Sequence, residues 1–156
     1  MTSNDNIIHV DKTPFDDVPE SQRPKMARKW ARERFQDKTF ENKHTGRRIK
    51  VTGSGIDHTV YKARDRQAFY FLAVLSEMIE KAKLKSSKPP KITEDGEPSE
   101  EDLIAFEIYA IKARFRGKLY NVEVNVKLKR GSENGAREIN SVGVHRNYYL
   151  HEIYEK

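Results

Sequence analysis

Three histidines, His58, His145 and His151, are candidates for proton transfer, because imidazole is the side chain that titrates near neutral pH. Cleavage of RNA without a metal needs a base that takes the 2′-OH proton and an acid that protonates the leaving 5′-oxygen. His58 is our candidate for one of these roles, and His145 or His151 for the other. Glu123 is an alternative candidate for either. The spacing of these residues leaves the assignments open.

The surroundings of His58 suit an anionic ligand. Gly53 and Gly55 precede the histidine, and glycine allows the backbone to approach a ligand closely. We expect a loop here that presents the imidazole to solvent. Three cationic residues lie near it in the sequence: Lys50, Lys62 and Arg64. The alternative is an ordinary loop in which the histidine has a structural role.

A second set of cations is expected on one face of a β-sheet. Alternating residues over 103–115 and 119–130, separated by a turn at Gly117, predict two paired strands. Their Val, Ile and Phe side chains would be buried together. The opposite face would carry Lys112, Arg114, Arg116, Glu123, Asn125, Lys127 and Lys129. We favour a nucleic-acid-binding face, with phosphates as the ligands of the cations, over a merely solvated one.

The cations have two candidate roles in such a site. Stabilising the charge of a phosphorane needs positive groups at the reacting phosphate, and the candidates are Lys62, Arg114 and Arg116. Lys112, Lys127 and Lys129 would bind the nucleic-acid backbone, together with His145. A last strand is predicted over about 143–154, where Tyr148 or Tyr149 is a candidate for stacking on a base.

Helices and a hairpin must position these groups. A helix is predicted over about 24–36, with Trp30 on its apolar stripe as a core residue and a basic remainder that we interpret as solvated. Residues 38–42 and 48–52 predict a hairpin, with Thr45-Gly46 in its turn. A second helix is predicted over about 65–83 from its length and composition.

These elements predict a single α+β domain over residues 24–156. Its N-terminal helix and central helix would pack on an antiparallel sheet of about four strands. Residues 1–23 are polar and lack periodicity, so we expect a flexible arm. Residues 85–102 are rich in Ser, Pro, Lys and Glu, so we expect a mobile loop there.

Composition narrows the class of protein. The net charge of +6 and the pI of about 9.4 favour a polyanionic partner such as RNA. The chain has no cysteine, which excludes disulfides and favours a reducing compartment, so we expect a cytoplasmic protein or one delivered into a target cell's cytoplasm. We expect no signal peptide and no contact with a membrane. No metal-ligand spacing or phosphate-loop motif is present, so we expect neither metal nor cofactor.

One stretch carries a family resemblance. The pattern Asn42…Thr45-Gly46…Ile49-x-Val51…Gly55-Ile56-x-His58 resembles small nuclease-like domains of phage polyvalent proteins and bacterial polymorphic toxins. These domains belong to, or stand beside, the barnase–EndoU–colicin–RelE group. The resemblance covers about residues 25–156. It implies an α+β fold, metal-independent RNA cleavage, and a cognate immunity protein or antitoxin in toxin members. It also matches His58 to an early active-site histidine and places Tyr148 and His151 at a second active position.

Two function classes follow. The first is an endoribonuclease that cleaves RNA, such as tRNA or ribosome-bound mRNA, by transesterification to a 2′,3′-cyclic phosphate. The second is a non-catalytic module of a larger phage or mobile-element protein that binds nucleic acid or an acidic protein. An inhibitor that docks acidic partners is a third, weaker reading. Loss of activity on changing His58 would favour the first, whereas weakened binding on changing Lys112, Arg114 or Arg116 would favour the second.

Overall fold

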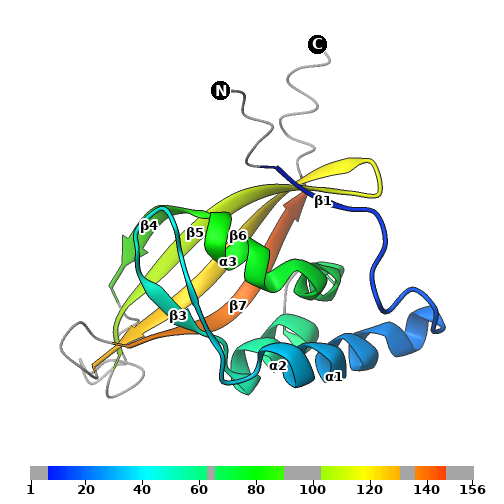
Figure 1. Ribbon diagram of the computed structural model, residues 1–156, viewed down its shortest axis with the longest axis horizontal. Helices are drawn as coiled ribbons and strands as arrows, with labels where there is room; N and C mark the ends of the chain where they lie inside the picture. The colour runs from blue at the N-terminus through cyan, green and yellow to red at the C-terminus, as the bar shows by residue number, and fades with distance from the viewer. Residues whose placement is uncertain (1–6, 63–65, 90–102, 131–135, 147–156) are drawn as a thin grey trace, which may run out of the picture.

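The computed structural model describes residues 7–62, 66–89, 103–130 and 136–146. These residues form an α+β fold in which a strongly curled sheet wraps around helix α3, while α2 lies beside β7 and α1 lies against α2 (Figure 1). The helices are α1 (Arg23–Phe35), α2 (Gly53–Tyr61) and α3 (Leu75–Lys81), with short 3-10 helices η2 (Glu20–Gln22) and η3 (Ala68–Val74). The strands are β1 (Ile7–Val10), β2 (Thr39–Glu41), β3 (Arg48–Lys50), β4 (Lys83–Lys88), β5 (Leu103–Phe115), β6 (Lys118–Lys129) and β7 (Ala136–Arg146).

The expected antiparallel sheet of about four strands was wrong, because the described part of the chain contains a mixed sheet of seven strands. Its order is β1-β5-β6-β7-β3-β2, and β4 also pairs with β5. The β1–β5 and β3–β7 pairings are parallel, whereas the other pairings are antiparallel. β1 and β4 share one edge of β5, with β1 opposite residues 112–115 and β4 opposite residues 106–110. Distant segments therefore complete the sheet around a central hairpin.

The β5–β6 hairpin is confirmed almost to the residue. Ile111 pairs with Val122 and Tyr109 with Val124, so the apolar side chains fall on one buried face. The turn between the strands needs a left-handed backbone at Arg116 and Gly117, with φ of 52° and 84°. Glycine adopts this conformation readily, which explains why the alternating pattern breaks there.

The N-terminal segment is not a free arm over the residues that the structure describes. Ile8 and Val10 of β1 are buried, and the strand runs parallel to β5. Phe15 is fully buried, and its ring meets that of Trp30 edge-on at a centroid distance of 5.5 Å. The expectation failed because four residues of β1 show too little alternation to reveal a strand whose partner lies about a hundred residues away.

The predicted helices differ in how closely they match. α1 agrees with the prediction: Pro24 occupies its first turn, Ala27 and Ala31 are buried, and Trp30 packs against the core. The helix expected over 65–83 is divided into η3 and α3 in the described residues. η3 carries Phe69, Tyr70 and Phe71, whose rings gather with those of two strand residues, Phe115 and Tyr120. The packing of these bulky rings favours a 3-10 helix over the expected α-helix in this segment.

The expected mobile loop begins later than predicted. Residues 83–88 form β4, where Leu84 packs against the core, while residues 90–102 lie outside the described residues. The last strand, predicted over 143–154, instead covers residues 136–146 as β7. Residues 147–156 also lie outside the described part of the chain.

Candidate functional site

The glycine-rich stretch before His58 is the first turn of a helix and not the expected loop. Thr52 caps α2, and its hydroxyl oxygen accepts a hydrogen bond of 3.0 Å from the backbone N–H of Gly55. A threonine cap satisfies one of the N–H groups that a helix leaves unpaired at its start. His58 therefore lies on a helix, which fixes the direction of its side chain more firmly than a loop would.

α2 lies along the edge of β7, and Gly55 makes this possible. A Cβ atom at Gly55 would lie 2.3 Å from the backbone oxygen of Ile139, which no side chain can tolerate. Ile56, on the neighbouring face of the helix, is fully buried in the core. The glycine pattern in the sequence thus serves close packing of helix on strand rather than contact with a ligand.

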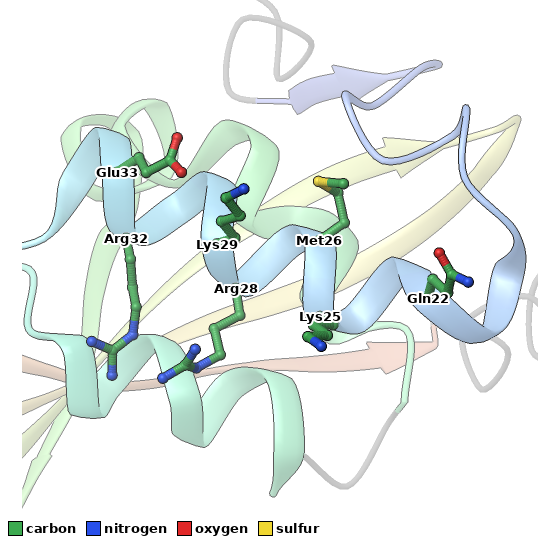
Figure 2. A pocket seen from close by; sticks show the side chains of 7 residues that line it. All are labelled: Gln22, Lys25, Met26, Arg28, Lys29, Arg32 and Glu33. Atoms are coloured by element: carbon green, nitrogen blue, oxygen red, sulfur yellow. The ribbon is translucent and has the colours of Figure 1, made fainter.

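Two arginines fix α2 against α1. Arg28 Nε lies 2.7 Å from Asp57 Oδ1, and Arg32 Nη2 lies 2.7 Å from Asp57 Oδ2. Figure 2 shows both guanidinium groups reaching from α1 toward α2. The hydrogen bond from Arg32 lowers the pKa of the Asp57 carboxyl, the bond from Arg28 adds to this, and burial opposes it. The carboxylate next to His58 is thereby kept ionised and turned toward α1.

His58 lies in a positive electrostatic environment. The imidazole is half-buried on α2, and this desolvation lowers its pKa from the ordinary value of 6.5. Lys62, one turn later on the same helix, and Lys127 of β6 lower the pKa further. We call His58, Lys62 and Lys127 the His58 site. Residues from α2 and from the sheet therefore contribute to one cationic surface.

The other cations predicted on the sheet face do not all join this surface. Lys112 is exposed on β5, and Arg114 donates a hydrogen bond to the Gly117 oxygen at the β5–β6 turn. Arg116 instead pairs with Asp16 at 2.6 Å, and its guanidinium lies over the rings of Tyr70 and Phe115. It helps to hold the N-terminal segment in place, because the left-handed turn directs it away from the alternating face.

Glu123 and Lys129, which were also predicted on this sheet face, each form an ion pair. Glu123 accepts a hydrogen bond of 2.8 Å from Lys85 of β4, across β5 and away from β7. Lys129 lies 3.3 Å from Glu138 of β7. Glu123 is thus directed toward the β4 side of the sheet, whereas the His58 site lies on the β7 side.

The remaining predicted site residues lie near or beyond the end of β7. The backbone of His145 pairs with Asn121 of β6. Tyr148 and His151 lie outside the described residues. The proton-transfer partner that the sequence suggested for His58 therefore remains a prediction.

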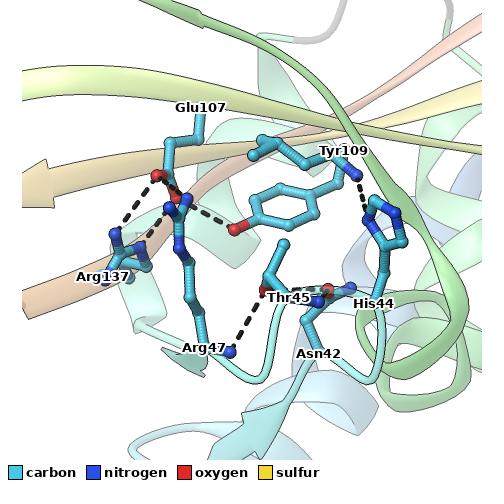
Figure 3. A network of polar contacts seen from close by, with 8 residues as sticks. Asn42, His44, Thr45, Arg47, Glu107, Tyr109 and Arg137 are labelled. Carbon is cyan, nitrogen blue, oxygen red and sulfur yellow. Dashed lines mark hydrogen bonds and ion pairs between the residues drawn. The ribbon is translucent and has the colours of Figure 1, made fainter.

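The motif Asn42…Thr45-Gly46 builds a turn that holds the β2–β3 hairpin on the rest of the fold (Figure 3). The buried Asn42 amide donates to the backbone oxygens of Ile79 and Ala82, at 2.9 and 2.6 Å. Its side-chain oxygen accepts a hydrogen bond from the backbone N–H of Thr45. Gly46 then supplies the positive φ of 74°. The motif that carried the family resemblance has this structural role.

A buried ion cluster lies next to this turn. Glu107 of β5 is 3% exposed, and its carboxylate lies 2.6 Å from Arg47 Nη1 and 2.8 Å from Arg137 Nε. It also accepts a hydrogen bond of 3.0 Å from the Tyr109 hydroxyl. Burial raises the pKa of Tyr109, and Glu107 raises it further. The cluster joins the β2–β3 turn to β5 and β7 on the concave face of the sheet (Figure 3).

Sequence reasoning missed the Glu107 cluster and the contact of Asp57 with α1. Glu107 had one available signal, because it falls in phase with Tyr109 and Ile111 on the buried face of the predicted strand. A carboxylate at such a position requires cationic partners. Asp57 had no comparable signal, because its partners come from a helix whose orientation the sequence does not indicate.

Together, the fold and the site define a small basic α+β domain in which Arg28, Arg32, Lys62 and Lys127 lie near α2. Residues 20–149 match the family model for large polyvalent protein-associated domain 3, and the chain belongs to this family. The match supports the expected association with phage polyvalent proteins, but it gives no support to a nuclease-like fold. No curated protein and no solved structure matches the chain.

Two further findings concern the described residues alone. None of the helices there is both long enough and apolar enough to cross a bilayer. The same residues contain no group of three or more His, Cys, Asp or Glu side chains arranged to hold a metal ion.

Proposed function

We propose that this domain is a nucleic-acid-binding module of a larger phage protein, and that the His58 site contacts the phosphate backbone. The observation that carries the proposal is the placement of a half-buried His58 on α2 with Lys62 at the end of the same helix, and the effect of Lys127 on the pKa of His58 supports it. Two separate elements of the fold thus raise the positive potential at one partly buried imidazole. A phosphate placed there would be attracted by both lysines and would accept hydrogen bonds from them.

The charge of the whole chain supports the same ligand. The net charge of +6 attracts a polyanion over long distances, while the His58 site provides a local point of contact. Arg28 and Arg32 add positive charge beside α2, although Asp57 neutralises part of it. This arrangement favours contact with the backbone over reading of base edges, so we expect weak dependence on sequence.

The test is the salt dependence of binding to a fluorescent RNA oligonucleotide, measured by anisotropy. Lys62→Gln and Lys127→Gln should each weaken binding and reduce the slope of log affinity against log salt by about one or slightly less, since each removes one phosphate contact. Lys81→Gln is the matched control, because it removes the same charge from α3, where Lys81 pairs with Glu77 at 2.8 Å. Equal slopes for all three variants, or no binding by the wild type, would contradict the proposal.

Metal-independent RNA cleavage is a second candidate function, and the state of His58 is the observation that favours it. A lowered pKa keeps the imidazole neutral at pH 7, which is the form that a general base requires. In this reaction the 2′-oxygen loses its proton to the base and attacks the adjacent phosphorus. The bond to the 5′-oxygen breaks, this oxygen takes up a proton from water, and the products are a 2′,3′-cyclic phosphate and a 5′-hydroxyl. Lys62 and Lys127 would stabilise the phosphorane charge.

Cleavage is tested separately from binding. Wild-type protein should degrade RNA in the presence of EDTA, and His58→Ala should reduce the rate by about two to four orders of magnitude, as expected for loss of a general base. His9→Ala is the control, because His9 is exposed on β1. If the protein binds RNA but does not cleave it, the binding module is supported and the nuclease is rejected.

A further inference from the structure

Tyr61 is the most exposed large hydrophobic side chain in the described part of the protein. It is the last residue of α2, and 61% of its surface is accessible to solvent. The only other residue of this kind there, Ile104, is 43% exposed on β5. A tyrosine ring exposed at the end of a helix offers both an apolar face and a polar hydroxyl to a ligand.

The neighbours of Tyr61 at the end of α2 are a histidine and a lysine, of which the lysine supplies the positive charge. His58 precedes it by three residues, and Lys62 follows it directly. On α1, the pKa of Arg32 is raised mainly by its hydrogen bond to Asp57, and Tyr61 makes a small further contribution. A surface hollow of about 640 Å³ along α1 has Arg32 among its lining residues, together with Lys25 and Lys29 (Figure 2). Tyr61 is thus a neighbour of His58 and Lys62 at the end of α2, on the helix that Arg28 and Arg32 of α1 contact through Asp57.

This combination matches the two parts of a nucleotide. The ammonium group of Lys62 suits a phosphate, and the face of the ring suits a base. Aromatic rings beside basic grooves are a general means of binding single strands, because every base has a π-face that can stack. Bases in a duplex are already stacked on their neighbours and cannot lie against a protein ring without being displaced.

We propose that Tyr61 is a base-stacking platform and that the ligand of this domain is a single-stranded nucleic acid. The inference rests on the proposed function and names the form of nucleic acid that the site takes. The strand would place one base on the Tyr61 ring, one neighbouring phosphate at Lys62 and Lys127, and another toward Arg32. A protein surface that covers the ring within a larger assembly is the competing explanation.

Three ligands of equal length separate these explanations in an anisotropy titration: a short uridine oligonucleotide, the same backbone with abasic sites, and a duplex. Tyr61→Ala should weaken binding to the uridine strand about tenfold, in the range measured for single base–aromatic stacks. It should leave affinity for the abasic strand unchanged, since no base is present to stack. Tyr61→Phe should bind as the wild type does, because it retains the ring.

Ile104→Ala is the control, because it truncates the other exposed apolar side chain, which belongs to β5 and not to α2. It should not affect any of the three affinities. Tyr61→Ala should also leave the unfolding midpoint nearly unchanged, since the ring is largely solvated in the folded state. A large loss of stability would assign the ring a structural role and overturn the inference.

The failures of the two proposals are distinguishable. If the wild type binds none of the three ligands, the proposed function is wrong, and the stacking proposal is wrong with it. If Lys62→Gln and Lys127→Gln weaken binding but Tyr61→Ala does not, the phosphate site remains and the stacking platform is rejected. Equal weakening of the uridine and abasic strands by Tyr61→Ala would likewise reject stacking.

Discussion

The Thr59 hydroxyl of α2 accepts a hydrogen bond of 2.9 Å from the backbone N–H of Val142 in β7. The same hydroxyl donates to the Gly55 oxygen one helical turn earlier, also at 2.9 Å. β3 pairs with β7 only at Glu138, so α2 takes over the edge of β7 where the strand pairing stops. A side chain thus replaces a neighbouring strand, and the direction in which His58 points depends on this contact.

Replacing Thr59 with valine should therefore destabilise the protein. Valine has nearly the same shape, but it leaves the buried N–H of Val142 without a partner, which costs about 1–3 kcal/mol of unfolding free energy. Thr59→Ser keeps the hydroxyl and should cost less than Thr59→Val. Urea denaturation followed by circular dichroism measures both. A stability of Thr59→Val equal to that of the wild type would show that the hydrogen bond has no net effect on folding.

Gly55→Ala should be costly because the new methyl group would collide with the backbone of Ile139. A backbone oxygen at 2.3 Å cannot rotate away as a side chain can, so α2 would have to move off β7. Overpacking of this kind costs about 1–3 kcal/mol. Gly143→Ala is the control, since a Cβ there would make only an ordinary contact of 3.6 Å with the Asn125 amide. Equal thermal midpoints for the two variants would contradict this account.

Glu107→Gln tests the buried ion cluster. The amide preserves the shape of the side chain, but it leaves the guanidinium of Arg137, whose side chain is 12% exposed, without its counter-ion. Removing one partner of a buried pair costs about 3–5 kcal/mol. Glu77→Gln breaks the exposed pair with Lys81 on α3 and should cost no more than about 0.5 kcal/mol. Chemical denaturation of the two variants should separate these values clearly.

The part of the fold that the sequence predicts well is local. The β5–β6 hairpin follows from alternation on both sides of Gly117, and α1 follows from the spacing of its apolar residues. Both elements are formed by contacts between neighbours in the chain. β1 and β4 have no such signal, because Ile7–Val10 and Lys83–Lys88 are short and are stabilised by pairing with the distant edge of β5.

The candidate site could also be predicted only in part from the sequence. His58, Lys62 and Lys127 were named from the sequence, yet a glycine-rich loop was expected where α2 carries His58 and ends next to Lys62. Helix propensity is poor in Gly53–Tyr61, which contains two glycines and β-branched residues. Tertiary contacts overcome it: the Thr52 cap, the close packing of Gly55 and the Asp57 ion pairs. None of these contacts can be inferred from local spacing.

The electrostatic contribution of Lys127 to the His58 site can be measured in the folded protein by NMR titration of the imidazole. Lys127→Gln should raise the pKa of His58, because removing a nearby positive charge makes protonation easier. Lys62→Gln should act in the same direction. Lys112→Gln, on the exposed face of β5, is the control and should leave the titration unchanged. If the pKa of His58 is unchanged in Lys127→Gln, Lys127 of β6 does not belong to the His58 site.

The lowered pKa of His58 also predicts how stability depends on pH. Above pH 6.5 the imidazole is neutral in both the folded and the unfolded chain, so it contributes no pH dependence. As the pH falls through 6.5, the unfolded chain binds a proton before the folded protein does, and the free energy of unfolding decreases until the folded pKa is reached. His58→Gln should remove this decrease, leaving a flatter profile between pH 7 and pH 5 in urea denaturation.

Bound RNA should raise the pKa of His58, because a phosphate favours the protonated imidazole. Affinity should then rise as the pH is lowered, and His58→Gln should lose that rise.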